Sequence, residues 1–193
     1  MLPWYVTGAG LVVLIIVLIV PVFRAGPPTN GAGPDAARAS GPMQSGVGSP
    51  PPLSGNMRDN ADRLFNRIMQ ARETGDSAQA TQFLPMAISA YQQAAPLDAD
   101  GSYHLSLLQS YAGQPDAALA TAREILAGNP THLLGLSAAA QAAQLAGRVD
   151  ESRGYYRKIL EVYPTESKRS LVEYQDHANV LPAIEAEAKQ RVQ

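Results

Sequence analysis

Histidine and carboxylate side chains are the residues of this chain that could support a metal site or acid–base catalysis. The three histidines, His104, His132 and His177, lie far apart in the sequence and lack the ligand spacing of a zinc site. Glu173 and His177 are four residues apart, so they share one face of a predicted helix and each could offer a ligand atom. A surface hydrogen bond or ion pair explains the same spacing. We therefore predict no metal site and no cofactor.

Two short motifs begin like functional loops but are incomplete. The stretch DADG at 98–101 begins like a calcium loop, yet the third acidic ligand and the closing Glu are missing, so we expect Asp100 to cap a helix. The stretch GLSAA at 135–139 begins like a nucleophile elbow, but Ala139 stands where the second glycine belongs and the segment has the pattern of a helix interior. We predict that the chain is not an enzyme and has no small-molecule substrate.

The composition excludes further classes. The chain has 15 Lys and Arg against 17 Asp and Glu, a net charge of −2 and no basic run, so binding to a phosphate backbone is not expected. It has no cysteine, which excludes disulfides and thiolate metal sites and leaves the redox compartment open.

The elements that must position any functional residue begin with an apolar span. Residues 4–23 carry no charge, and at about 1.5 Å per residue they match a bilayer core of roughly 30 Å. We predict a transmembrane anchor over 1–24. The alternative is a cleaved signal peptide, which this segment does not resemble because it has no basic n-region and no A-x-A site.

Individual residues support the anchor. Trp4 and Tyr5 fall where amphipathic rings favour the membrane interface, and Arg24 closes the far end. Gly8 and Gly10 would let another helix approach closely, although glycine is common in such helices in any case. The positive-inside rule favours a cytoplasmic domain after the span, whereas most bacterial N-terminal anchors export the domain that they carry. We expect the periplasmic side of a bacterial inner membrane, with the cytoplasmic side as the alternative.

A linker extends over residues 25–56. It contains seven Gly and seven Pro, so it can form neither a regular helix nor a strand. As a flexible coil it would span roughly 30 Å, enough to reach a partner set back from the membrane. Where the linker becomes ordered, we expect it to lie along partner subunits with Met43, Val47 and Leu53 as its apolar anchors.

The remaining residues, 57–193, have apolar positions at helical spacing and no alternating β-branched runs, which predicts an all-α domain. Two segments align at a separation of 34 residues, pairing Gly113 with Gly147 and Pro130 with Pro164. A period of this length is typical of one antiparallel helix pair per unit.

In these residues the chain resembles the tetratricopeptide repeat (TPR) family, in a single-pass, membrane-anchored bacterial form. The resemblance implies repeats at 60–98, 99–132 and 133–166 and a capping helix within 167–193, together a solenoid of antiparallel helix pairs. It places Gly113 and Gly147 at the turns between paired helices and Pro130 and Pro164 at the stop after each second helix.

The family's packing positions are only partly matched. Small residues stand where paired helices pack closest, at Ser106 and Ala140, and where the second helix meets the next repeat, at Ala118 and Ser152. The departures are Ser102 for a Trp-like residue, Gln109 for a Tyr, and Ile125 and Ile159 for small residues.

The resemblance also implies a concave groove lined by the first helix of each pair. The side chains that it places there are Phe65, Met69, Arg72, Tyr103, Leu107, Tyr111, Gln141 and Gln144. Aromatic and Met side chains beside amides suit an apolar peptide or helix whose backbone also needs hydrogen bonds. For Phe65 and Leu107 a core position is an equal alternative. The Lys and Asn pair with which some TPR domains hold a C-terminal carboxylate is absent.

Two classes of function are consistent with these features. In the first, the protein is a non-catalytic, membrane-anchored subunit that scaffolds or stabilises a larger membrane protein complex, for which a photosynthetic or respiratory assembly is our guess. In the second, it is a free-standing TPR adaptor or chaperone for envelope or cytochrome c assembly. The expected partners are other protein subunits and the lipid bilayer, with no nucleic acid.

Overall fold

The computed structural model describes residues 55–193. Every regular element in this range is an α-helix, which confirms the predicted all-α class for these residues. None of these helices is both long and apolar enough to cross a membrane. The predicted anchor and linker residues lie outside the described part of the chain: Trp4, Tyr5, Gly8, Gly10, Arg24, Met43, Val47 and Leu53.

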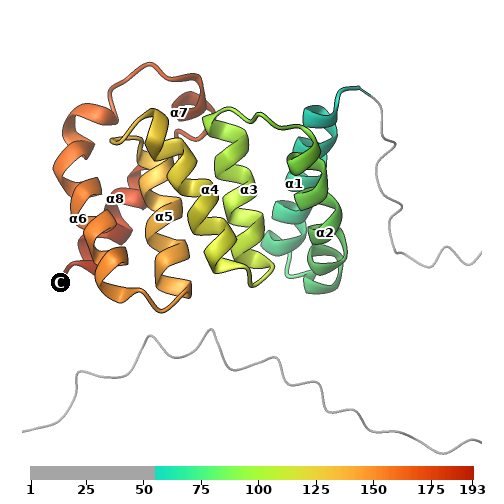
Figure 1. Ribbon diagram of the computed structural model, residues 1–193, viewed down its shortest axis with the longest axis horizontal. Helices are drawn as coiled ribbons and strands as arrows, with labels where there is room; N and C mark the ends of the chain where they lie inside the picture. Colours follow the sequence, from blue (N-terminus) through green and yellow to red (C-terminus); the bar gives the residue numbers. More distant parts are fainter. Residues whose placement is uncertain (1–54) are drawn as a thin grey trace, which may run out of the picture. The chain divides into compact units, whose positions relative to one another are not determined.

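The helices succeed one another with short connections. Their bounds are α1 Met57–Glu73, α2 Ser77–Gln93, α3 Ala99–Tyr111, α4 Pro115–Gly128, α5 Leu133–Leu145, α6 Val149–Glu166, α7 Val172–Asp176 and α8 Val180–Arg191. In Figure 1, α1 and α2 stand side by side at the right, and α3, α4, α5 and α6 follow towards the left. Helix α1 packs on α2, α3 on α4 and α5 on α6. The C-terminal helix α8 packs on α6 and α5.

Side-chain caps start several of these helices. Asn56, Asp76 and Asp98 each accept a hydrogen bond from the backbone N–H three residues later, at 2.8–2.9 Å. The prediction that Asp100 caps a helix is therefore wrong, because α3 begins after Asp98 and places Asp100 in its first turn. The Asp100 carboxylate is thus available for contacts outside its own helix.

Glycine turns close the first three helix pairs in one way. Gly75, Gly113 and Gly147 have φ values of 78°, 70° and 75°, the left-handed region that favours glycine. After each, the next residue's N–H bonds to a carbonyl five residues back, as in Asp76 to Ala71 at 2.8 Å. The predicted tight turns at Gly113 and Gly147 are confirmed.

Pro130 and Pro164 were both predicted to follow the end of a helix, and only Pro130 does so. Pro130 lies just beyond the end of α4, as predicted. Pro164 does not end its helix, because α6 continues to Glu166 with this proline inside it. Pro164 has no N–H to donate to the Leu160 carbonyl, so α6 lacks one helical hydrogen bond there. Its last turn is closed by Ser167 Oγ, which donates to the Tyr163 carbonyl at 2.6 Å. Because α6 continues past Pro164, Glu166 lies at its end, where the side chain is buried.

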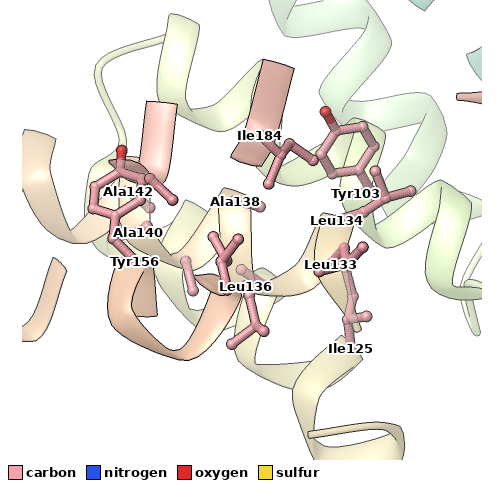
Figure 2. Packing of buried hydrophobic residues seen from close by; sticks show 14 of the residues in the cluster. Tyr103, Ile125, Leu133, Leu134, Leu136, Ala138, Ala140, Ala142, Tyr156 and Ile184 are labelled. Atoms are coloured by element: carbon pink, nitrogen blue, oxygen red, sulfur yellow. The ribbon is translucent and has the colours of Figure 1, made fainter. Parts of the chain in front are cut away.

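The core has two parts that meet at α3. One contains side chains of α1, α2 and α3, and the other extends from α3 to α8, with Tyr103, Tyr156 and Ile184 among its members (Figure 2). Serine hydroxyls link paired helices, since Ser106 Oγ donates to the Ala118 carbonyl at 2.9 Å and Ser152 Oγ to the Ala140 carbonyl at 2.8 Å. These four residues are almost fully buried. Ser106 and Ala140 thus lie where paired helices approach closely, as predicted. Ala118 and Ser152, which were expected to meet the next repeat, bond instead to the first helix of their own pair.

Candidate functional site

The predicted groove residues come from the first helix of each pair. Phe65, Met69 and Arg72 lie on α1, Tyr103, Leu107 and Tyr111 on α3, and Gln141 and Gln144 on α5. The structure divides them into an accessible set, a buried set and a partly exposed set whose side chains bond to other helices of the chain.

The accessible set is Met69, Arg72, Leu107 and Tyr111, which we call the α1–α3 strip. The guanidinium carbon of Arg72 lies 3.7 Å from the centre of the Tyr111 ring, a cation–π contact between the ends of the two helices. Tyr111 is 37% exposed, Arg72 is exposed, and Met69 and Leu107 are half-buried against the core. The strip therefore offers an aromatic face, a cation and two apolar side chains together.

Phe65 and Tyr103 are buried and belong to the core, so neither can line an open groove in this structure. Phe65 is 7% exposed and stacks on the His104 ring with centroids 3.8 Å apart. Tyr103 is 6% exposed, and the edge of its ring meets His177 at 5.2 Å. His177 comes directly after α7, so the returning C-terminal segment covers the place where Tyr103 was predicted to be open.

Gln141 and Gln144 are only partly exposed, and both bond within the chain. Gln141 Nε2 donates to Glu187 of α8 at 3.1 Å, and Gln144 Oε1 accepts from Ser152 at 3.5 Å. Glu187 also accepts from Tyr156 at 2.8 Å, which holds α8 in this position. Along α5, therefore, Gln141 is held by the C-terminal helix α8, and Gln144 is held by α6, the second helix of its own pair.

The histidines show a second feature that the sequence did not indicate. His132 Nε2 lies 2.9 Å from Glu173 Oε1, whereas His177 Nε2 lies 2.8 Å from Asp100 Oδ1. Glu173 and His177, which share a predicted helix face, therefore contact different helices. The Asp100 contact joins residues 77 positions apart, and the only local signal for this cluster was the four-residue spacing of Asp100 and His104 on α3.

Charged residues of α1 support this cluster from one side. Arg58 donates to Asp62 at 2.9 Å and to Asp100 Oδ2 at 2.7 Å. Burial raises the pKa of Asp62, but the interactions with His104, Tyr91 and Arg58 outweigh it and lower that pKa to about 2. The pKa of Asp100 is also lowered, because its interactions with His177, His104 and Arg58 outweigh its burial. Both carboxylates are therefore ionised at neutral pH.

The incomplete nucleophile motif at 135–139 lies inside helix α5, as its sequence pattern predicted. Ser137 is 2% exposed inside α5, so its hydroxyl faces no cleft in the described part of the chain.

Comparisons with known proteins found neither a matching protein-family model nor a significantly similar curated protein.

Proposed function

We propose that the protein is a non-catalytic, membrane-anchored interaction subunit of a larger membrane protein complex. The observation that carries this proposal is the α1–α3 strip, where an exposed tyrosine, an arginine and two apolar side chains meet across two helices. Tyrosine and arginine are the residue types most often found at the energetic centre of protein interfaces. The occupant that fits is an apolar peptide or helix of another subunit with a carboxylate near Arg72.

The repeated geometry supports a TPR-like solenoid as the scaffold for this surface. Gly75, Gly113 and Gly147 share one backbone conformation, and the second and third pairs share the serine-to-carbonyl link. Repeat arrays of this type present an extended surface formed by equivalent helices. In our proposal α8 acts as the capping helix that covers the last apolar face.

The anchor at 1–24 and the linker at 25–56 complete the proposal. The anchor holds the helical domain at a bacterial inner membrane, preferably on its periplasmic side, and the linker lets the domain reach a partner beyond the headgroups. Digestion of spheroplasts with an external protease tests this orientation. Cleavage of the helical domain in intact spheroplasts supports the periplasm, and cleavage only after lysis places the domain in the cytoplasm.

The test of function is the composition of the material extracted by mild detergent. A subunit should co-purify with its complex in a fixed ratio, and Tyr111→Ala should lower that ratio because the strip loses its aromatic anchor. The exposed Arg157→Ala, placed away from the strip on α6, is the control. If the chain separates alone under all mild conditions, the adaptor class replaces the subunit. If Tyr111→Ala leaves the ratio unchanged, the strip is not the contact surface.

A further inference from the structure

His104 has a buried ring nitrogen without a partner. The residue is 8% exposed, and its Nε2 makes no hydrogen bond within residues 55–193. The Oδ1 atom of Asp100 lies 3.6 Å away, beyond hydrogen-bond distance. Since almost all buried polar atoms in folded proteins have a partner, this nitrogen requires an explanation.

The hydrogen bonds on the other side of the ring identify its tautomer. Tyr91 Oη donates to Asp62 at 2.6 Å, because a carboxylate can only accept. Having used its single proton there, the Tyr91 hydroxyl can only accept from His104 Nδ1, which lies 3.0 Å away. Nδ1 therefore carries a proton, and Nε2 is the ring nitrogen left for a further partner, 3.6 Å from Asp100 Oδ1. His104 Nε2 and Asp100 Oδ1 are both atoms that can bind a metal cation, and a cation between them would give this nitrogen its missing partner.

A third donor completes the arrangement. His177 joins His104 and Asp100, and one ligand atom from each of the three residues lies within 4.8 Å of the other two. Around a tetrahedral zinc ion, ligand atoms are about 3.4 Å apart. The 3.6 Å separation of His104 and Asp100 already matches this value, and the 2.8 Å separation of His177 and Asp100 needs to lengthen slightly. Histidine and cysteine are common zinc ligands. The whole chain has three histidines and no cysteine, and two of those histidines meet here.

The surroundings hold the donors as a metal site requires. Tyr91 orients the His104 ring through Nδ1, and Arg58 binds Asp100 through Oδ2, which leaves Oδ1 for a metal. Phe65 stacks on His104 at 3.8 Å, and Tyr103 meets His177 edge-on at 5.2 Å. These contacts restrict both imidazole rings without using the donor atoms.

A cleft of about 400 Å³ reaches the cluster beside Asp100. Five carboxylates line it, those of Asp62, Asp98, Asp100, Glu173 and Asp176, together with Arg58. An acidic entrance raises the local concentration of divalent cations.

We propose that Asp100, His104 and His177 bind one zinc ion, which joins α3 to the turn between α7 and α8. Two imidazoles and one carboxylate suit zinc, and three protein ligands with a water molecule complete its usual tetrahedron. Zinc replaces the proton on His177 Nε2, and that proton moves to Nδ1 of the same ring. The ion thereby fastens the C-terminal segment over Tyr103. This inference does not depend on the proposed function.

The test uses the full-length chain, purified in detergent without a polyhistidine tag and stripped of metal with a chelator. Isothermal titration with ZnCl₂ should show one equivalent bound per chain. Zinc at a hundredfold excess over its Kd should raise the melting temperature by at least about 5 °C, and EDTA should reverse this rise. Hydrogen exchange should slow at the backbone amides of residues 172–184, since the ion fastens this segment.

Variants locate the ion. Asp100→Asn and His177→Gln change partly exposed ligands, so they test the site without removing the buried His104 ring, and each should weaken zinc binding at least about tenfold. Asp176→Asn is the matched control, because it removes the same charge from the same cleft and should keep binding within about twofold. Absence of stoichiometric zinc binding overturns the proposal. Unchanged affinity in both ligand variants, or equal loss in the control, overturns it as well.

Discussion

Glu166 shows how a single residue ties distant parts of this fold together. Its carboxylate is 5% exposed and accepts hydrogen bonds from Asn129, Thr131, Arg169 and Tyr174 at 2.8–3.3 Å. Burial raises the pKa of Glu166, but these four donors outweigh it and hold that pKa below the ordinary value of 4.5. The end of α6 is thereby joined to the loop before α5 and to α7.

We expect Glu166→Gln to lower the free energy of unfolding by about 1–3 kcal/mol at neutral pH, because buried donors lose a charged acceptor. In the wild type, the Glu166 contribution is complete above the unfolded pKa of 4.5 and is lost as the pH falls through the lower folded pKa. Urea unfolding between pH 3 and pH 7 measures both effects. An equal loss of stability in acid for the wild type and the variant would contradict this role.

Two tyrosines of α3 separate surface from core. We expect Tyr111→Ala to change the free energy of unfolding by no more than about 0.5 kcal/mol, because this ring is 37% exposed and belongs to neither core cluster. Tyr103→Ala should cost about 3–5 kcal/mol, because it empties a buried position between α3 and the C-terminal segment. Denaturant melts of the two variants measure the difference. If Tyr111→Ala unfolds the domain, the strip is part of the core and not a binding surface.

At the scale of the elements, glycine turns control how each helix pair closes. Gly113 has φ 70°, and a Cβ added there meets nothing within 4 Å, so a substitution is opposed by backbone conformation alone. We expect Gly113→Ala to destabilise the domain by about 1–2 kcal/mol. Gly154 also has open space around an added Cβ but lies inside α6, so Gly154→Ala should stabilise by up to about 1 kcal/mol. Thermal melts showing shifts of the same sign would refute the conformational explanation.

The C-terminal segment is the element that most changes the surface of the domain. Gln141 bonds to Glu187 of α8, and Tyr103 and Asp100 lie against His177. The protein's own C-terminal segment thus covers surface that the helix pairs by themselves would leave open along α3 and α5. The accessible surface that remains for a partner in our proposal is concentrated at α1 and the end of α3.

At the scale of the whole molecule, the apolar span at 4–23 should hold the protein in the membrane. We expect the full-length chain to stay in the pellet after a sodium carbonate wash at high pH, which removes proteins bound only by surface contacts. A chain that begins at residue 25 is the matched control and should be released. Release of the intact full-length chain would refute the anchor.

The sequence by itself determined the helical class, the turns at Gly113 and Gly147 and the close packing of paired helices at Ser106 and Ala140. These features depend on local backbone preference and on a spacing repeated every 34 residues, so they can be deduced from neighbouring positions. Only the tertiary structure decided that Tyr103 is buried, that Asp98 and not Asp100 caps α3, and that Asp100 meets His177. The last contact requires the chain to return across 77 residues, and no local pattern encodes where a returning segment settles. Its position results from the summed burial of Leu181, Ile184 and Ala188 against the earlier helices.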